Sequence, residues 1–457
     1  MKKIIIMSAI ASTMLFAQET TQQSLQEQLA NKKVSPYVEK SGYMPDISLI
    51  VDASYTHQSW DEEGHTDELE LPGFVHGGGH DHDGHSHTSL AGDDGFNFNY
   101  AELTIGASVD KYFDLKGVFH ITEDDFEVEE AFATTRSLPY HLQLKLGKFK
   151  SDFGYLNNKH HHNYNFYEMP LVYSAILGDH GLTEQGFQLQ YVVPADQYIM
   201  VGLEAFKGEN ERSFGYEGFT LGEDGHDHDE HDEHEEEGDD EEHDEHEEGH
   251  MTSVDDTDFP SLWVAYAKTS FDIGGGTLLA GVSMAQGDSR MNHLEDEESP
   301  HAYEGENTLY GVDLTYKYYF AADNAITWQS EYIYREMDGT KYVEGQDGEW
   351  KDVALNKEQS GYYTELIYQY DKNYRAGVRY SALNQNDITA NGNIQKMPDD
   401  MYVTSAMLEY NPSEFSRIRL QYNHNSSLYD EEGHKNNKNE IVLQFNYAIG
   451  AHGAHSF

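Results

Sequence analysis

The sequence predicts an all-β protein: a transmembrane antiparallel up-and-down β-barrel of about 16 strands, with long extracellular loops rich in histidine and acidic residues and no plug domain. Three observations lead to this prediction. An export signal precedes many segments in which apolar and polar residues alternate. No later apolar run reaches the length of a membrane-spanning helix. The links between the segments alternate between short and long, which is typical of outer-membrane barrels.

The N-terminus has the pattern of an export signal. Lys2 and Lys3 are followed by an apolar run over 4–16 and by Ala17. We therefore expect a signal peptide over 1–17, a short periplasmic segment over 18–45 and the barrel over 46–457. The 28 residues from 18 to 45 are too few for a plug domain and suffice for a short helix.

The barrel segments show the two-residue period of strands with one apolar and one polar face. Ile47, Leu49 and Val51 share one parity, while Ser48 and Asp52 occupy the other. The same alternation recurs almost to the C-terminus. A soluble β-sandwich would bury one face of so many strands in an apolar core, and the hydrophobic content of 38% is low for that.

The links give the number of strands. Short links are expected near 110–114, 137–140, 194–197, 271–276, 321–324, 371–373 and 411–414. Longer polar links are expected over 61–95, 123–127, 150–181, 209–258, 287–305, 338–358, 384–399 and 426–438. Seven short and eight long links join 16 strands and leave both termini on the short-turn side, which is the periplasmic side in outer-membrane barrels.

Composition excludes several classes of partner and site. The formal net charge of -54 argues against nucleic acid and favours cations near the surface. The absence of cysteine excludes disulfides and thiolate metal sites. The expected surroundings are the lipid of the cell outer membrane, and any metal must be bound by nitrogen and oxygen ligands.

Two tracts, 76–87 and 226–250, consist almost entirely of histidine, acidic residues and glycine, and they fall in the long links 61–95 and 209–258. Imidazole and carboxylate are ligands that zinc accepts, and nickel or copper are alternatives. The tracts therefore predict metal binding at the extracellular mouth. The candidate ligands in the tracts are His76, His80, His82, His85, His87, His226, His228, His231, His234, His243, His246 and His250.

A further histidine group, His160, His161 and His162, falls in the third long link. It is a candidate for metal binding, or for a loop that folds inward and lines the lumen. The adjacent carboxylates Glu129 and Glu130 are expected to point to opposite faces of a strand. No nucleophile elbow, phosphate loop or fixed zinc-protease spacing is present, so we predict that the protein is not an enzyme.

The segment 147–186, with GKFKSDFG, NNKHHHNYNFYEMPLVY and GDHGLTEQGFQL, resembles zinc-regulated bacterial outer-membrane proteins that are often labelled TonB-dependent receptors. It is more distantly similar to phosphate-selective porins. The resemblance implies a channel or receptor made in response to zinc supply. In the porin relatives this stretch ends a strand and leads into an inward-folding third loop, so Lys148 and Lys150 are candidates for the pore lining, with ordinary interface lysines as the alternative. A homotrimer and a link to the TonB system stay open.

The leading hypothesis is a porin-like channel or receptor whose loops capture divalent metal ions, with zinc first, and assist their uptake. One alternative is a general or anion-preferring solute porin whose loops only sequester metal or shield the surface. Another is a TonB-linked receptor that lacks a plug.

Because a ligating imidazole must be neutral, metal binding by the tracts should weaken as the pH falls through about 6.5, the unperturbed histidine pKa. Isothermal titration of zinc into a peptide of the second tract checks this. Equal affinity about one pH unit above and below that value would contradict it.

Overall fold

The computed structural model describes residues 45–60, 69–74, 94–123, 125–210, 212–222, 252–294, 300–345, 348–430 and 432–450. The expected signal peptide, nearly all of the 18–45 segment and both histidine tracts lie outside these residues. None of the helices in the described part of the chain is long and apolar enough to cross a membrane.

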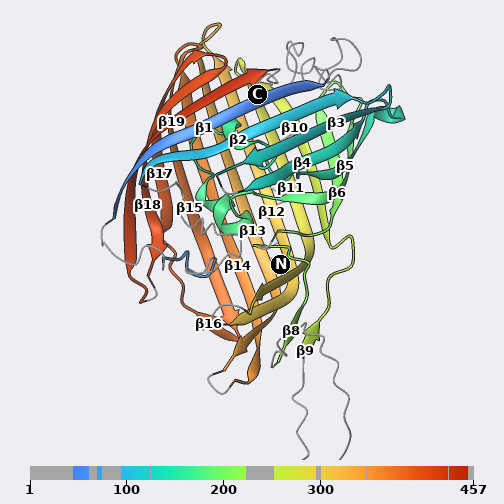
Figure 1. The fold of residues 1–457 in the computed structure, drawn as a ribbon, viewed down its shortest axis with the longest axis vertical. Coiled ribbons are helices and arrows are strands. Elements are labelled where there is room, and N and C mark those ends of the chain that lie inside the picture. The colour runs from blue at the N-terminus through green and yellow to red at the C-terminus, as the bar shows by residue number, and fades with distance from the viewer. Residues whose placement is uncertain are drawn as a thin grey trace, which may run out of the picture.

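Sixteen of the described strands form one closed antiparallel barrel, in which each strand pairs with the next and β19 pairs back to β1 (Figure 1). The expected strand number is therefore confirmed. The barrel strands are β1 (Asp46–Trp60), β2 (Gly95–Ser108), β3 (Phe113–Ile121), β4 (Phe126–Thr135), β5 (Leu142–Lys150), β6 (Thr183–Val192), β7 (Ile199–Phe206), β10 (Leu262–Ile273), β11 (Gly276–His293), β12 (His301–Tyr319), β13 (Ala325–Glu344), β14 (Trp350–Gln369), β15 (Tyr374–Ala390), β17 (Met401–Ser413), β18 (Ser416–Tyr429) and β19 (Lys435–Gly450). Short elements in the links are η3 (Pro139–His141), η4 (His161–Asn163), α3 (Leu171–Leu177), β8 (Phe219–Leu221), β9 (Thr252–Val254) and β16 (Asn393–Gln395).

The barrel is apolar outside and polar inside. On β1 the side chain of Ile47 is 52% exposed on the outer face, whereas Asp52, Ser54 and Thr56 are buried on the inner face. This is the reverse of a soluble protein, in which the buried side is apolar. The outer face is therefore suited to lipid, and a soluble sandwich is excluded.

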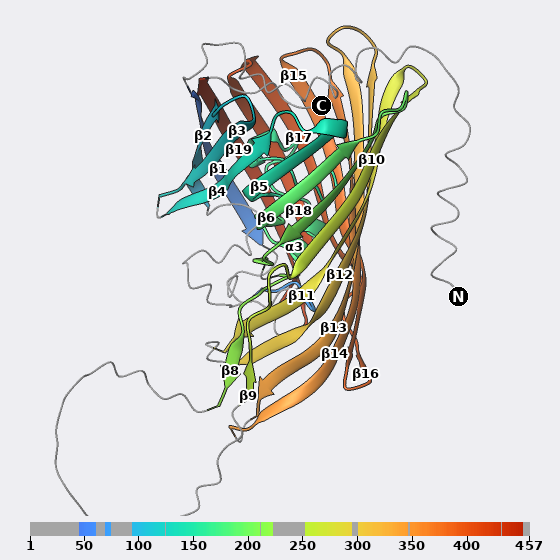
Figure 2. The same cartoon turned by 90° about the vertical axis from the view of Figure 1, so that its right-hand side faces the viewer.

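The two sides of the barrel differ in height, and this corrects part of the expected link pattern. Strands β11 to β15 have 17 to 20 residues, whereas β3 to β7 have 8 to 10. The expected long links 287–305, 338–358 and 384–399 are thus largely strand. Their residues continue the ladder, as in the pairing of His301 with Val343, so the wall of β11 to β15 projects on the long-loop side (Figure 2). About 9–11 residues already span a bilayer.

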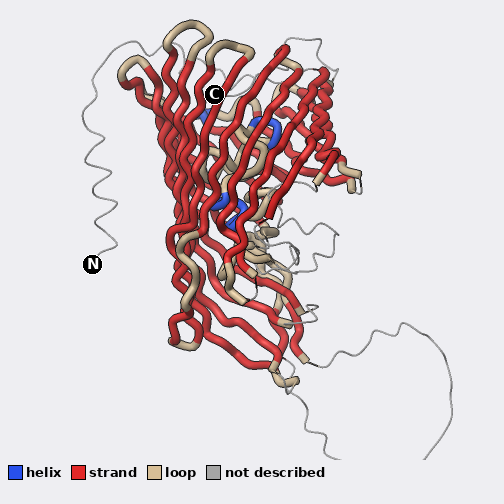
Figure 3. Tube along the Cα trace, turned by 90° about the vertical axis from the view of Figure 1, so that its left-hand side faces the viewer, coloured by secondary structure: helices blue, strands red, loops and turns tan. Residues whose placement is uncertain are grey.

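The third long link, residues 151–182 and called L3 from here on, folds into the barrel. Its helix α3 packs against β14 and β15, and Figure 3 shows helical segments enclosed by the strands. Ser151 donates its backbone N–H to the carbonyl of Leu182 at 2.9 Å, and the side chain of Asn157 bonds both of these residues. The two ends of L3 are thus tied together at its base.

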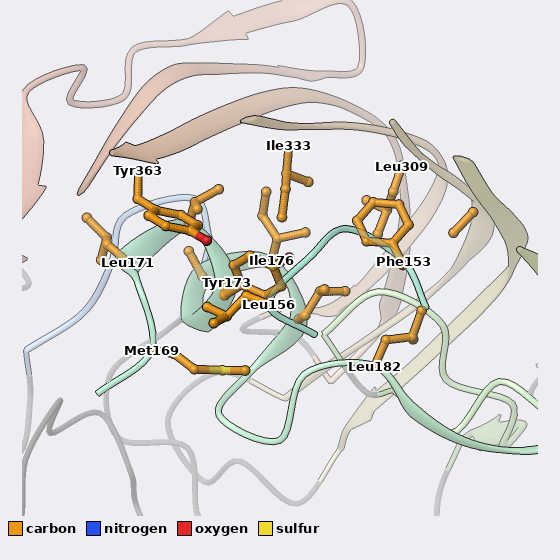
Figure 4. Close-up of a cluster of buried hydrophobic side chains, with 14 of the residues drawn as sticks. Phe153, Leu156, Met169, Leu171, Tyr173, Ile176, Leu182, Leu309, Ile333 and Tyr363 are labelled. Atoms are coloured by element: carbon orange, nitrogen blue, oxygen red, sulfur yellow. The ribbon is translucent and has the colours of Figure 1, made fainter. Parts of the chain in front are cut away.

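Apolar side chains of L3 form the main hydrophobic core with the inner wall of the barrel (Figure 4). Phe153, Tyr173 and Ile176 from L3 are fully buried, and so are Leu309 and Tyr363 from the wall. Burial of one such side chain contributes about 1.5–3 kcal/mol. The lumen is therefore partly filled by the protein's own loop.

Glu331 on β13 anchors L3 to this wall. Its carboxylate accepts the backbone N–H of Tyr155 at 2.8 Å, that of Leu156 at 3.0 Å and the Tyr173 hydroxyl at 2.7 Å. Because Glu331 is buried, a donor that lost this acceptor would be left unsatisfied in the interior.

We predict that Glu331→Gln loosens L3, since the amide replaces an acceptor oxygen with a donor group. An unsatisfied buried donor costs about 1–3 kcal/mol, so amide hydrogen exchange at Tyr155 and Leu156 should accelerate about tenfold or more. Glu344→Gln, at an exposed position of the same strand, is the control and should change neither rate. Unchanged exchange in the Glu331 variant would contradict the anchoring role.

Candidate functional site in the barrel lumen

The predicted metal ligands of the two tracts, from His76 to His87 and from His226 to His250, lie outside the described residues. The segments that lead into them are described. Residues 69–74 pack into the mouth, where the carbonyl of Gly73 accepts hydrogen bonds from Gln359 at 2.9 Å and Lys357 at 3.1 Å. The second tract is attached between β8 and β9, a small hairpin on the long-loop side (Figure 2).

L3 brings the His160–His162 group into the barrel, against the wall of β2, β3 and β4. His160 and His162 are buried, and their rings stack with centroids 5.7 Å apart. His161 and His162 lie in the 3-10 turn η4, and His160 directly precedes it as the N-cap residue. The inward fold expected as one alternative is observed, and metal binding by the group stays a prediction.

Glu129 and Glu130 both face this triplet, which corrects the expectation that they point to opposite faces. The register between β3 and β4 shifts, because Val118 pairs with Glu130 and Phe119 with Val128. Glu129 is the extra residue of this β-bulge, and a bulge re-aims the side chains around it. Both carboxylates are thus buried in the lumen.

The histidines and carboxylates are paired by short contacts. His160 lies 3.1 Å from Glu129 through Nδ1 and 3.0 Å from Glu130 through Nε2. His162 lies 3.0 Å from Glu102. Together with Lys116, His120, Lys150 and His161, these residues form what we call the carboxylate–histidine cluster.

The two neighbouring imidazoles of L3 differ in charge. Burial alone would lower the pKa of His160, but the carboxylates of Glu129 and Glu102 raise it to about 10. Burial, followed by the Lys150 ammonium, lowers the pKa of His161 to about 3. At neutral pH, His160 is therefore protonated and pairs with the carboxylates, whereas His161 is neutral.

Four arginines on β15 and β18 hold the following part of L3. Arg417 donates to the carbonyl of His162 at 2.9 Å, Arg419 to that of Tyr164 at 2.8 Å and Arg379 to that of Glu168 at 2.8 Å. Arg375 and Arg419 also pair with the buried Glu409, at 3.0 and 2.8 Å. L3 therefore lies between a wall rich in carboxylates and a row of guanidinium groups.

The two candidate pore lysines have different surroundings. The Nζ of Lys150 is buried and lies 2.9 Å from Glu129. Lys148 has the parity of the outward-facing Leu146 and pairs with Glu127 at 3.4 Å, with both side chains about a third exposed. Lys150 thus belongs to the carboxylate–histidine cluster, and Lys148 does not.

Sequence reasoning singled out the histidine triplet and did not single out Glu102, His120 or the arginine row as site residues. Their signal was present as charge on the polar parity of strands, for example Glu102 in β2 and Arg417 and Arg419 in β18. That pattern predicts which face of a strand is polar, but it does not show which strands lie opposite L3.

A closed barrel with an apolar outer face, a charged lumen and an inward-folded third loop defines the class: a porin-like β-barrel of the outer membrane. In the described residues the lumen contains L3 and no separate plug domain.

The chain is 42% identical over 432 residues to an uncharacterized protein of Aquifex aeolicus (strain VF5), a match that covers 94% of this chain and 84% of the relative. The chain therefore belongs to the same family as that protein. No family model matches.

Solved structures with similarity over most of the chain include outer-membrane channels. OmpT of Vibrio cholerae is 11% identical, with coverage of 91% of this chain and 100% of that one and a TM-score of 0.47. The outer membrane channel DcaP of Acinetobacter baumannii is 12% identical, with coverage of 91% and 100% and a TM-score of 0.48. An anion-selective porin from Comamonas acidovorans is 11% identical, with coverage of 89% and 99% and a TM-score of 0.45.

The two lysines make a matched test of the cluster. Lys150→Met removes one of the two cations that contact the buried Glu129, the other being His160, and removal of one partner of a buried pair costs about 3–5 kcal/mol. Lys148→Met removes a partly exposed pair and should cost less than about 1 kcal/mol. The unfolding midpoint of the barrel in denaturant checks the difference. Equal destabilisation by the two variants would contradict the assignment of Lys150 to the cluster.

Proposed function

We propose that the protein is a diffusion channel for small hydrophilic solutes and that L3 forms its constriction. The observation that carries this proposal is the charged lumen, which L3 enters and narrows. A polar barrel interior of this size admits water. The paired charges on both sides of L3 would fix the loop in place and expose solutes to opposite charges.

The finer part of the proposal is that the outer mouth collects divalent metal ions, with zinc as the leading candidate and nickel or copper as alternatives. Glu223 to His250 holds 18 carboxylates and no basic residue, so it attracts cations at long range. Its histidines add ligands that zinc accepts. The attachment of this tract to the β8–β9 hairpin supports a location at the mouth of the barrel.

The arginine row favours a second candidate, a general or anion-preferring solute porin. Arg375 on β15 and Arg417 on β18 contribute positive charge to a different part of the wall from Glu102, Glu129 and Glu130, and guanidinium groups attract anions. In this case the loops would sequester metal or shield the surface without supplying the channel. A plugless receptor linked to the TonB system and a homotrimeric assembly stay hypotheses, because no observation on the described residues favours either.

Planar-bilayer recordings in zinc chloride test the proposal. The variant has both tracts replaced by Gly/Ser linkers of equal length, and a second variant keeps the acidic residues but has glutamine for every tract histidine. We expect the native channel to prefer cations and to lose part of this preference in the linker variant, because the funnel of negative charge is gone. A loss of zinc preference in the glutamine variant, which keeps the acidic residues, would identify the imidazoles as the selective groups.

Two outcomes would decide against parts of the proposal. An ion preference that is the same in all three proteins would support the solute porin whose loops have another task. An absence of conductance in the correctly folded native barrel would contradict the channel itself.

A further inference from the structure

The carboxylate–histidine cluster includes one histidine, His120 on β3, that has no hydrogen-bond partner among the described residues. Its imidazole makes no hydrogen bond or ion pair with any residue that the structure describes, although it lies directly opposite Glu102 of β2 in the sheet register. The bulge at Glu129 brings a second carboxylate to the same place. One ligand atom from each of Glu102, His120 and Glu129 lies within 4.8 Å of the other two.

A second free imidazole approaches from L3. The ring centroid of His161 lies 6.2 Å from that of His120, and His161 likewise has no hydrogen-bond partner in the described chain. Both rings contact Tyr100, which stacks on His120 at 4.4 Å. The Tyr100 hydroxyl is buried and has no hydrogen-bond partner either. His120, His161 and Tyr100, three polar side chains without hydrogen-bond partners in the described chain, therefore surround the carboxylates of Glu102 and Glu129.

The carboxylates have outer partners that orient them. Glu102 contacts His162 at 3.0 Å, and Glu129 contacts Lys150 at 2.9 Å. Each carboxylate oxygen has two lone pairs, so an oxygen that accepts a hydrogen bond can also bind a cation. Such outer partners are a regular feature of metal sites, where they fix the ligands in position.

The surroundings keep the carboxylates of the cluster charged although they are buried. Glu102, Glu129 and Glu130 face the ammonium groups of Lys116 and Lys150 and the protonated His160. Buried charges persist only when they are paired, and ionised carboxylates of this kind are ligands for a divalent cation.

We propose that Glu102, His120 and Glu129 form a divalent-cation site inside the lumen, and that His161 supplies a fourth ligand from L3. Bonds of about 2.0–2.2 Å place the ligand atoms of a tetrahedral zinc ion about 3.4 Å apart. The side chains would thus close by about 1 Å around the ion. The site is separate from the two tracts, and it would connect the wall of β2 to β4 with the loop that narrows the channel.

Unlike metal binding at the tracts, metal binding at this site would act directly on L3. A cation bound to wall residues and to His161 adds a bond between the barrel and the constriction. The ion binds the folded arrangement and not the unfolded chain, so it should stabilise this arrangement by mass action. Metal occupancy and the position of L3 are thereby coupled.

The test uses the full-length barrel in which both tracts are replaced by Gly/Ser linkers of equal length, purified in detergent and freed of metal with a chelator. Isothermal titration with zinc should give one site per barrel. His120→Phe keeps a ring that can stack on Tyr100 and removes both nitrogen ligands, so it should weaken zinc binding at least tenfold. His141→Phe, in the exposed η3 turn, is the matched control and should bind as the parent does.

Two further readouts separate a ligand from a structural residue. Zinc should raise the unfolding temperature of the linker protein but not that of its His120→Phe variant, and cobalt should give a visible absorption band that the variant lacks. If His120→Phe does not fold, as judged by its heat-modifiable mobility, His120→Leu takes its place.

The absence of saturable zinc binding in the linker protein, or equal binding by the parent and the folded His120 variant, would overturn the lumen site. Because the tracts are absent from this experiment, such a result leaves the proposed function of the tracts untouched.

Discussion

The structure depends on one constraint: a chain that crosses a lipid bilayer as strands must pair every backbone polar group within itself. The pairing of β1 with β19 satisfies this constraint, because it closes the sheet and removes both edges. Closure then fixes the direction of the side chains. Residues such as Ile47 face lipid, while alternate residues such as Asp52 face the lumen.

The lumen in turn contains many charged side chains that are buried, and L3 pairs with a large share of them. Glu331 accepts three hydrogen bonds of 2.7 to 3.0 Å from L3, and Arg419 joins the carbonyl of Tyr164 to Glu409. On the other side, His160 lies between Glu129 and Glu130. Removal of L3 would leave these groups unpaired, so the same contacts that position the constriction also stabilise the barrel interior.

The architecture could be predicted from the sequence because it follows local rules. Alternation such as that of Ile47, Leu49 and Val51 reports which face of a strand is apolar, and the order of short and long links reports the strand number. The length of strands β11 to β15 could not be predicted. Residues at their ends, such as His301 and Val343, show no clear alternation of apolar and polar side chains, and they pair only in the folded sheet.

The candidate site was predicted in part. The His160–His162 triplet was visible as a cluster of ligand types, and the inward fold of L3 was one of two alternatives. The partners of the triplet were not predictable, because Glu102 is 58 residues away from His160 in the sequence. The bulge at Glu129 breaks the two-residue period on which the expectation for Glu129 and Glu130 was based.

L3 lies inside the barrel against the wall of β13 to β15, and a cross-link between the two tests this placement directly. The chain has no cysteine, so any disulfide must come from the introduced pair of cysteines. A Cβ atom at Gly361 of β14 would lie 2.9 Å from the side chain of Val172 in L3, which makes Val172→Cys with Gly361→Cys the pair to use. We expect a nearly complete disulfide on mild oxidation of the folded barrel. Free thiols at both positions, open to a membrane-impermeant reagent, would contradict it.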